Sequence, residues 1–352
     1  MSRSHEHRCA CQGFLGSYVF RELIKANDPV LRGIAFETVQ RDERARTARD
    51  APADVLSGNG DARGKLRRIF DMRGSEQLPP SIEMIARAEG DETDIGNEAV
   101  DDAYLHAGIV YDFFKEVLGH DSFDGEGECE MEVCVNYGIG TANAYWNGMY
   151  MLFGPGDGQY FQSFTKSLAA MAHEMSHAVL KFSSDLEYKG EAGALNESFC
   201  DVMAMSVVQW HLQQDARSAD WSIGGEVLGP VLADIRAVRT FRQKPAYEGH
   251  VLLGTDPQPK HVADYKNLQT ADGGVHINSG IPNHAFYRAA QAVSGPARIF
   301  DHLTKIWFEA FTKLPPDASF KDAAQATRNA ASRFGPEIED AVAKAWHDVG
   351  VV

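Results

Sequence analysis

The pentapeptide HEMSH, residues 173–177, constrains the fold of this chain more than any other stretch of its sequence. It lies in the run KSLAAMAHEMSHAVLKF, whose apolar spacing predicts a helix. Positions four residues apart share one face of a helix, so His173 and His177 should point the same way. Two imidazoles on one face can bind one metal ion, and Glu174 stands within reach of a water on that ion. The plainer alternative is a histidine pair packed in a helical core.

The following helix favours the metal site. GALNESFCDVMAMSVVQWHLQQ places Glu197 20 residues after His177 and Asp201 one helical turn further on. This helix also carries many apolar residues, so it should be largely buried, and buried carboxylates need partners. Glu197 is therefore the candidate third ligand, and Asp201 is the candidate acceptor for the second N–H of a ligand histidine. Three protein ligands and an open position are typical of a catalytic zinc site.

The rest of the chain divides into a strand-rich part and a helical part. Strand-like runs are KLRRIFDMRG, CEMEVCVNYG and NAYWNGMYMLFGPGDG. Helical spacing is found at 97–119, 166–182, 193–214, 281–293, 297–314, 320–334 and 338–347. The pattern predicts an α+β fold of two lobes, β-rich at the N-terminus and mainly helical at the C-terminus, with the metal site in the cleft between them. The predicted domains are 1–50, 51–160 and 161–352.

Bulk composition excludes several classes of partner. The net charge of −16 and the pI near 5.2 argue against nucleic acid or an anionic membrane. We find no apolar run long enough to span a bilayer, and the N-terminal apolar stretch is too interrupted for a signal peptide. We therefore expect synthesis in the cytoplasm, with leaderless secretion left open. Five cysteines, an odd number, argue against a disulfide framework, and Cys129 and Cys134 should lie on opposite faces of one strand.

Four motifs in order carry a resemblance to a known family. HEMSH, GALNESFCD after it, NAYWNG before it and GGVHINSGIPNHAFY later resemble the thermolysin-type (M4) zinc metallopeptidases. The pattern is most similar to the protealysin-like branch, which has a short propeptide and no signal peptide. The resemblance covers roughly residues 65–350. It implies a zinc endopeptidase with one catalytic ion that acts on proteins or peptides, with a small protein inhibitor as a further candidate partner.

The resemblance implies roles for the residues of the metal site. His173, His177 and Glu197 resemble the three zinc ligands. Glu174 resembles the general base that activates the attacking water and carries its proton to the leaving amine. Asp201 resembles the partner of His173.

It also implies donors for the oxyanion of the reaction. Tyr188 matches a tyrosine that donates to the tetrahedral oxyanion, and His276 matches a histidine that shares this task. In relatives an Asp five residues before that histidine holds the imidazole, but here Ala271 stands at that position and an Asp follows at 272. An imidazole without a carboxylate partner has the lower pKa, so either the loop shifts or His276 is less often cationic.

Substrate-binding positions follow from the same resemblance. Asn143 and Ala144 match the segment that pairs with the substrate backbone. In DIRAVRTF we favour Arg239 over Arg236 as the arginine that binds a substrate carbonyl. The family's pocket for the side chain after the scissile bond matches Phe161, Phe164 and Ala170. This lining predicts a preference for an apolar residue such as Phe or Leu.

Two departures concern calcium and latency. Calcium-binding relatives have carboxylates where this chain has Ala169 and Val208, and Asp220 alone is weak for an ion that takes 6–8 oxygen ligands, so we predict little calcium dependence at that site. FLGSYVFRELI resembles an inhibitory propeptide, with Gly16-Ser17 in place of two prolines. Cys9 and Cys11 lie upstream, and a thiolate that binds the zinc is one hypothesis for latency, with exposed thiols in a loose terminus as the alternative.

Residues 1–45 otherwise read as a short amphipathic segment near Tyr18 to Lys25 and a charged tail. Residues 46–64 read as a linker in which self-cleavage would release the propeptide. Two alternatives to an active enzyme stay open. One is a catalytically weak binding or regulatory protein on a peptidase scaffold, and the other is a protein with a purely structural zinc ion.

Overall fold

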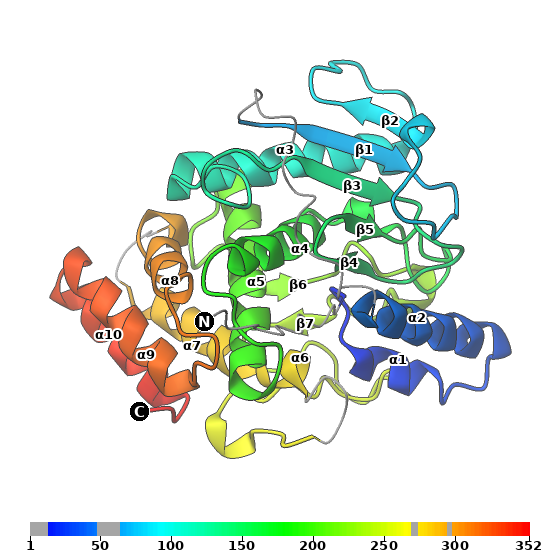
Figure 1. Ribbon diagram of the computed structural model, residues 1–352. Coiled ribbons are helices and arrows are strands. Elements are labelled where there is room, and N and C mark those ends of the chain that lie inside the picture. The colour runs from blue at the N-terminus through cyan, green and yellow to red at the C-terminus, as the bar shows by residue number, and fades with distance from the viewer. Residues whose placement is uncertain (1–12, 48–63, 269–273, 294–297) are drawn as a thin grey trace, which may run out of the picture.

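A mixed sheet of five strands organises the first half of the chain (Figure 1). The computed structural model describes residues 13–47, 64–268, 274–293 and 298–352. The strand order is β2-β1-β3-β5-β4, with β1, β3 and β5 parallel and β2 and β4 antiparallel at the edges. The strands are β1 (Arg67–Asp71), β2 (Ile85–Ala88), β3 (Met131–Val135), β4 (Ala144–Trp146) and β5 (Met151–Phe153). The central strands are mostly buried, as expected for parallel strands rich in apolar residues.

Helix α3 (Glu98–Leu118) covers this sheet and packs against β1 and β3. Its apolar stripe, which includes Val100, Val110 and Phe114, is buried. The helix ends at Gly119, whose left-handed φ of 67° suits glycine and closes the last turn.

Two central helices, α4 (Leu168–Lys181) and α5 (Gly190–His211), pack against each other and join the sheet to the C-terminal helices (Figure 1). Helix α4 begins where Ser167 accepts a hydrogen bond from the N–H of Ala170 (3.2 Å). The later helices are α6 (Val275–Asn278), α7 (Gly280–Ala292), α8 (Leu303–Phe311), α9 (Phe320–Ala331) and α10 (Pro336–Asp348). A small ribbon of β6 (Ser222–Ile223) and β7 (Arg239–Thr240) lies between α5 and α6 in the chain.

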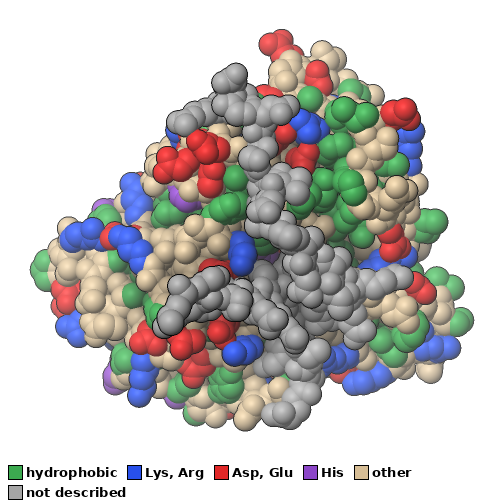
Figure 2. Space-filling model, viewed as in Figure 1, with side chains coloured by type: hydrophobic (Ala, Val, Ile, Leu, Met, Phe, Trp, Pro, Cys, Tyr) green, Lys and Arg blue, Asp and Glu red, His purple; other side chains and the backbone are tan. Residues whose placement is uncertain are grey.

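The predicted α+β fold of two lobes is confirmed: a mixed sheet with α3 forms the N-terminal lobe, and helices dominate the C-terminal lobe. Among the described residues, no helix combines the length and apolar character needed to cross a membrane. On the described part of the face in Figure 2, acidic and basic side chains are interspersed. That face therefore shows no broad basic patch for a polyanion.

One prediction for the N-terminal segment was wrong. Residues 40–47, in the stretch interpreted as a charged tail, belong to helix α2 (Pro29–Thr47), which follows α1 (Ser17–Leu23). Asp28 starts α2 by accepting from the N–H of Val30 (2.8 Å), and Leu31, Ala35 and Thr38 give it a buried stripe. The density of charge on the opposite face concealed this short stripe in the sequence. The predicted linker falls almost entirely within 48–63, outside the described residues.

Two smaller predictions also need correction. The helix expected over 297–314 is broken, because the chain bends at His302 (φ −135°, ψ −63°) between a short 3-10 turn (Ile299–Asp301) and α8. Cys129 lies outside strand β3, so it does not share that strand with Cys134. Both thiols, like that of Cys200, are buried and unbridged.

Candidate active site

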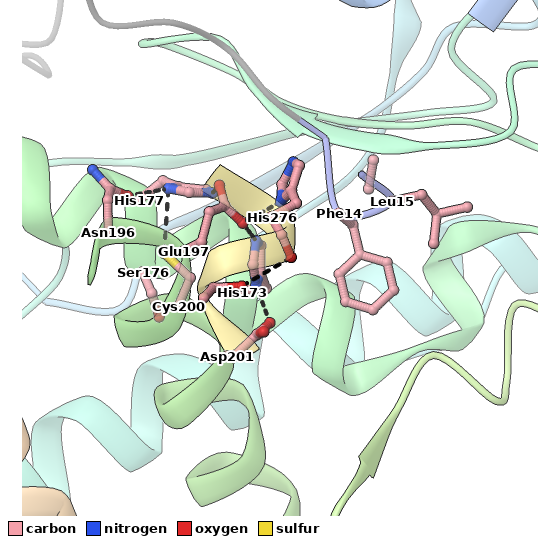
Figure 3. Close-up of polar contacts among 12 residues, drawn as sticks. Phe14, Leu15, His173, Ser176, His177, Asn196, Glu197, Cys200, Asp201 and His276 are labelled. Carbon is pink, nitrogen blue, oxygen red and sulfur yellow. Dashed lines mark hydrogen bonds and ion pairs between the residues drawn. The ribbon is translucent and has the colours of Figure 1, made fainter. Parts of the chain in front are cut away.

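Three donor groups from two helices converge on one point. His173 and His177 project from the same face of α4, and Glu197 faces them from α5 (Figure 3). The His173 Nε2 atom lies 3.4 Å from Glu197 Oε2, and the His177 Nε2 atom lies 3.6 Å from Glu197 Oε1. All three side chains are at least nine-tenths buried.

These separations fit a zinc ion. A tetrahedral ion with bonds of roughly 2.0–2.1 Å places its ligand atoms about 3.3 Å apart. The observed 3.4 and 3.6 Å agree with that spacing, and two imidazoles with one carboxylate form a donor set common in catalytic zinc sites. Burial lowers the pKa of His173, but Asp201 and Glu197 outweigh it and raise the pKa to about 9. A cation that binds here therefore has to displace a proton from His173, whose charged form the two carboxylates stabilise.

Cys200 also belongs to this cluster of metal-binding side chains. One possible ligand atom from each residue, the Cys200 Sγ atom and a ring nitrogen of His173 and of His177, lies within 4.8 Å of the other two. However, the Cys200 Sγ atom faces the Nδ1 atom of His177 at 3.2 Å, whereas the Nε2 atoms face Glu197. The thiol therefore lies beside the Nδ1 atom of His177, away from the Nε2 atoms, and Glu197 is the better candidate for the third donor. Burial raises the pKa of the Cys200 thiol well above its usual value, which also disfavours a thiolate ligand.

Both candidate ligand imidazoles are oriented through their second nitrogen atoms. His173 Nδ1 lies 3.0 Å from Asp201 Oδ1, and His177 Nδ1 lies 2.8 Å from Asn196 Oδ1. Hydrogen bonds at Nδ1 place the proton there and leave Nε2 as the ligand atom. Asn196 was not predicted from the sequence, although it immediately precedes Glu197 in GALNESFCD.

Asp201 is fixed by a buried network of its own. Arg239 donates to it from Nε (2.9 Å), and Asn283 donates from Nδ2 (2.8 Å). Burial opposes the charge of Asp201, but Arg239 and His173 hold its pKa well below the usual range. Of the two arginines considered, only Arg239 reaches the site, because Arg236 is exposed on the preceding turn.

Tyr188 and His276 both contact the carboxylate of Glu197. The Tyr188 hydroxyl donates to Glu197 Oε1, and His276 Nδ1 lies 2.7 Å from Glu197 Oε2. Gly193 makes this proximity possible: a Cβ there would lie 2.5 Å from a Val275 methyl and 2.9 Å from the Tyr188 carbonyl carbon. Helix α5 therefore approaches both oxyanion candidates closely.

His276 is the second residue of α6, which begins directly after Gly274 (φ 74°). Gln258 Nε2 donates to the His276 carbonyl (2.8 Å), so the backbone of this turn has a buried support that the sequence did not reveal. Ala271 and Asp272 lie outside the described residues, so a role for Asp272 stays a prediction. The premise that His276 lacks a carboxylate partner does not hold, because Glu197 Oε2 lies 2.7 Å from its Nδ1 atom.

The N-terminal segment is bound across the site. The N–H of Phe14 donates to the carbonyl of Ala144 (3.0 Å), at the start of edge strand β4. The Asn143 side chain accepts from the N–H of Leu15 (2.8 Å) and donates to its carbonyl (3.1 Å). Arg239 Nη1 donates to the Phe14 carbonyl (2.7 Å). The positions assigned to substrate backbone are therefore all engaged by this chain's own residues.

The Phe14 ring points down beside His173 (Figure 3). The two rings meet edge to face at 5.6 Å between centroids, and Phe14 meets Phe164 at 6.4 Å. Phe161 packs against Phe164 (6.2 Å) and against Phe20 of α1 (6.3 Å). Ala170, at the start of α4, is fully buried.

The remaining predicted positions are less informative. Cys9 and Cys11 lie outside the described residues, so the thiolate hypothesis stays a prediction. At the expected calcium site, Ala169 is buried and Asp220 is exposed.

A histidine pair on one helix, completed by a carboxylate from the next helix in a fold of two lobes, defines the class of zinc metallopeptidases. Residues 63–181 match the family described as "Thermolysin metallopeptidase, catalytic domain". Residues 184–351 match "Thermolysin metallopeptidase, alpha-helical domain". The chain therefore belongs to the thermolysin metallopeptidase family and is a metallopeptidase.

Individual relatives agree with this assignment. The chain is 40% identical over 288 residues to an extracellular metalloprotease of Pectobacterium carotovorum subsp. carotovorum, covering 81% of both chains. It is 33% identical to a thermolysin of Alicyclobacillus acidocaldarius subsp. acidocaldarius, covering 82% of this chain and 52% of that protein. The solved precursor of protealysin, a metalloproteinase from Serratia proteamaculans, matches with a TM-score of 0.84 at 35% identity, covering 97% of this chain and 100% of that one.

Proposed function

We propose that this protein is a zinc-dependent endopeptidase made as a latent precursor. The observation that carries the proposal is the convergence of His173, His177 and Glu197 on one point, next to a peptide segment of the chain itself whose backbone is hydrogen-bonded to the protein. Phe14 and Leu15 engage Asn143, Ala144 and Arg239 as a substrate backbone would. The same segment blocks the site, which supports latency of the precursor. Latency would end when the N-terminal residues are released by the predicted cut in 46–64.

The side chains support hydrolysis with distinct tasks. Zinc, when bound, supplies a Lewis acid that polarises the substrate carbonyl and lowers the pKa of water to about 7. Glu174, fully buried on α4 between the two ligand histidines, accepts the proton of the attacking water and delivers it to the leaving amine. Tyr188 and His276 donate hydrogen bonds to the developing oxyanion, each worth about 3 kcal/mol in comparable sites.

Metal removal should separate this enzyme from a catalytically weak binding protein. Casein cleavage by the processed protein is expected to vanish with 1,10-phenanthroline and to return with added zinc, because three buried donors form one zinc site. Calcium removal by EGTA in zinc-containing buffer should change the rate by less than about twofold, since Ala169 and Val208 replace oxygen ligands. Casein cleavage that survives phenanthroline would contradict the proposed mechanism. A loss of activity in EGTA that only calcium restores would contradict the calcium prediction.

The residue after the scissile bond should be apolar. Phe14 occupies the pocket beside Phe164 and is fully buried, and the nearby Arg239 is already paired with Asp201. A carboxylate placed there would be buried without a free partner, at a cost of several kcal/mol. Peptides with Gly-Phe-Leu at the cleavage site should therefore show a kcat/KM at least about 100-fold above that of Gly-Asp-Leu peptides. Gly-Leu-Leu serves as the apolar control, and equal rates for Phe and Asp would refute the prediction.

A further inference from the structure

The N-terminal segment has the direction and register of a substrate. Each backbone polar group from the Phe14 N–H to the Leu15 carbonyl is paired with the protein: Phe14 with Ala144 and Arg239, and Leu15 with both ends of the Asn143 amide. Buried backbone groups are normally paired, and here the partners are the residues assigned to a substrate backbone. The four bonds hold two consecutive residues against Asn143, against Ala144 at the start of edge strand β4, and against Arg239.

The position of the Phe14 ring identifies the bond that is presented. The ring fills the pocket for the side chain that follows a scissile bond, with the zinc-ligand candidate His173 on one side (5.6 Å) and Phe164 on another (6.4 Å). The Arg239 guanidinium lies 4.7 Å from the ring centroid and binds the carbonyl on the far side of Phe14. The peptide bond on the amino side, Gly13–Phe14, is therefore the one placed for attack.

Glycine is the residue that this register requires at position 13. A Cβ built on Gly13 would lie 2.2 Å from Asn143 Nδ2 and 2.6 Å from the Ala144 carbonyl oxygen. The Asn143 amide cannot swing away without losing both bonds to Leu15. The absent side chain therefore allows the backbone to lie directly on the substrate-binding strand.

We propose that the protein cleaves its own chain between Gly13 and Phe14 while the segment is docked, an inference that rests on the proposed peptidase function. Water adds its oxygen to the Gly13 carbonyl carbon, the C–N bond to Phe14 breaks, and Glu174 passes the proton of that water to the departing nitrogen. The products are residues 1–13 with a new carboxylate and residues 14–352 with a new amine at Phe14. The step consumes one water and needs no other reactant.

This cut does not by itself open the site. After cleavage the Phe14 nitrogen can still donate to Ala144, and the Phe14 and Leu15 carbonyls keep their donors. Residues Val19, Phe20 and Leu23 of α1 remain buried in the core that they share with the peptidase. The cleaved form therefore stays inhibited until a second cut, and removal of residues 1–13 should precede any gain in casein cleavage.

The test follows the full-length, zinc-loaded protein over time by intact mass and N-terminal sequencing, beside its Glu174→Gln variant. The expected first product begins at Phe14, and the variant keeps residues 1–13. Because the bond is presented within one molecule, the first-order rate should stay constant on about tenfold dilution. Phe14→Ala should slow this cut at least about tenfold, since it empties the pocket, whereas Phe36→Ala on the exposed face of α2 should not.

Three results would overturn the inference. In the first, the processed enzyme cleaves casein and Gly-Phe-Leu peptides, but the full-length protein keeps the Gly13–Phe14 bond throughout maturation. This result would leave the proposed function intact. The second is the same cut in Glu174→Gln, which would assign it to another protease. The third is an enzyme inactive on every substrate, which would remove the proposed function and this inference together.

Discussion

Replacing Glu174 with Gln is expected to lower kcat on a Gly-Phe-Leu peptide by about 10²–10⁴-fold, the usual contribution of a positioned general base. The amide keeps the size of the carboxylate but cannot accept the proton of the attacking water. Glu174 is fully buried on α4 and is not one of the three converging donors, so the variant should bind zinc as the parent does. Because the variant should not process itself, parent and variant are both cut in 46–64 by an added protease and repurified. The measurement is then steady-state kinetics, with zinc content determined on the same samples.

The control for this change is Glu116→Gln, the same substitution at an exposed position on α3. It should leave kcat unchanged. A Glu174→Gln enzyme that holds one zinc ion per chain and turns over within about threefold of the parent would exclude Glu174 as the base. Loss of zinc together with activity would instead show that Glu174 supports the metal site.

The sequence indicated which side chains of the candidate metal site would lie together, because their spacing is local. His173 and His177 share a helix face whatever surrounds them, and Glu197 lies on a helix whose apolar content required it to pack inward. The orientation of Asp201 towards His173 followed from one further helical turn. Local periodicity also gave the lobes and the order of the strands and helices, except where charge concealed the buried stripe of α2.

Contacts between distant segments could not be predicted in this way. Arg239 meets the Phe14 carbonyl across 225 positions, and Asn143 meets Leu15 across 128. The choice between Arg236 and Arg239 depended on the length of an irregular turn that no periodicity describes. Asn283, which donates to Asp201, comes from the interior of α7, where a polar residue in an apolar run gave only a weak signal. These residues are recognisable once the packing of α5, α7 and β7 is known.

Latency should depend on one aromatic side chain. Phe14→Ala in the full-length protein is expected to make the site accessible at least about 100-fold more often, because truncating a fully buried Phe costs about 3–5 kcal/mol and each 1.4 kcal/mol is tenfold. The backbone bonds to Asn143 and Arg239 remain available, but the ring that anchors the segment beside His173 is gone. Gly13→Ala should act in the same direction, since its Cβ would collide with the Asn143 amide.

Self-cleavage must be prevented for this result to be interpretable, so the changes are made on the Glu174→Gln background. A fluorescent Gly-Phe-Leu peptide is then titrated into each protein, and its apparent Kd reports the fraction of molecules with an open site. Phe36→Ala is the matched control: it makes the same chemical change in the same N-terminal segment, at a side chain 53% exposed. Tighter binding for Phe14→Ala but not for Phe36→Ala would establish that the docked residue closes the site. Equal affinities for the Glu174→Gln protein and for all variants made on it would mean that access is controlled elsewhere. Residues 14 and 15 would then be bound to the site without regulating it.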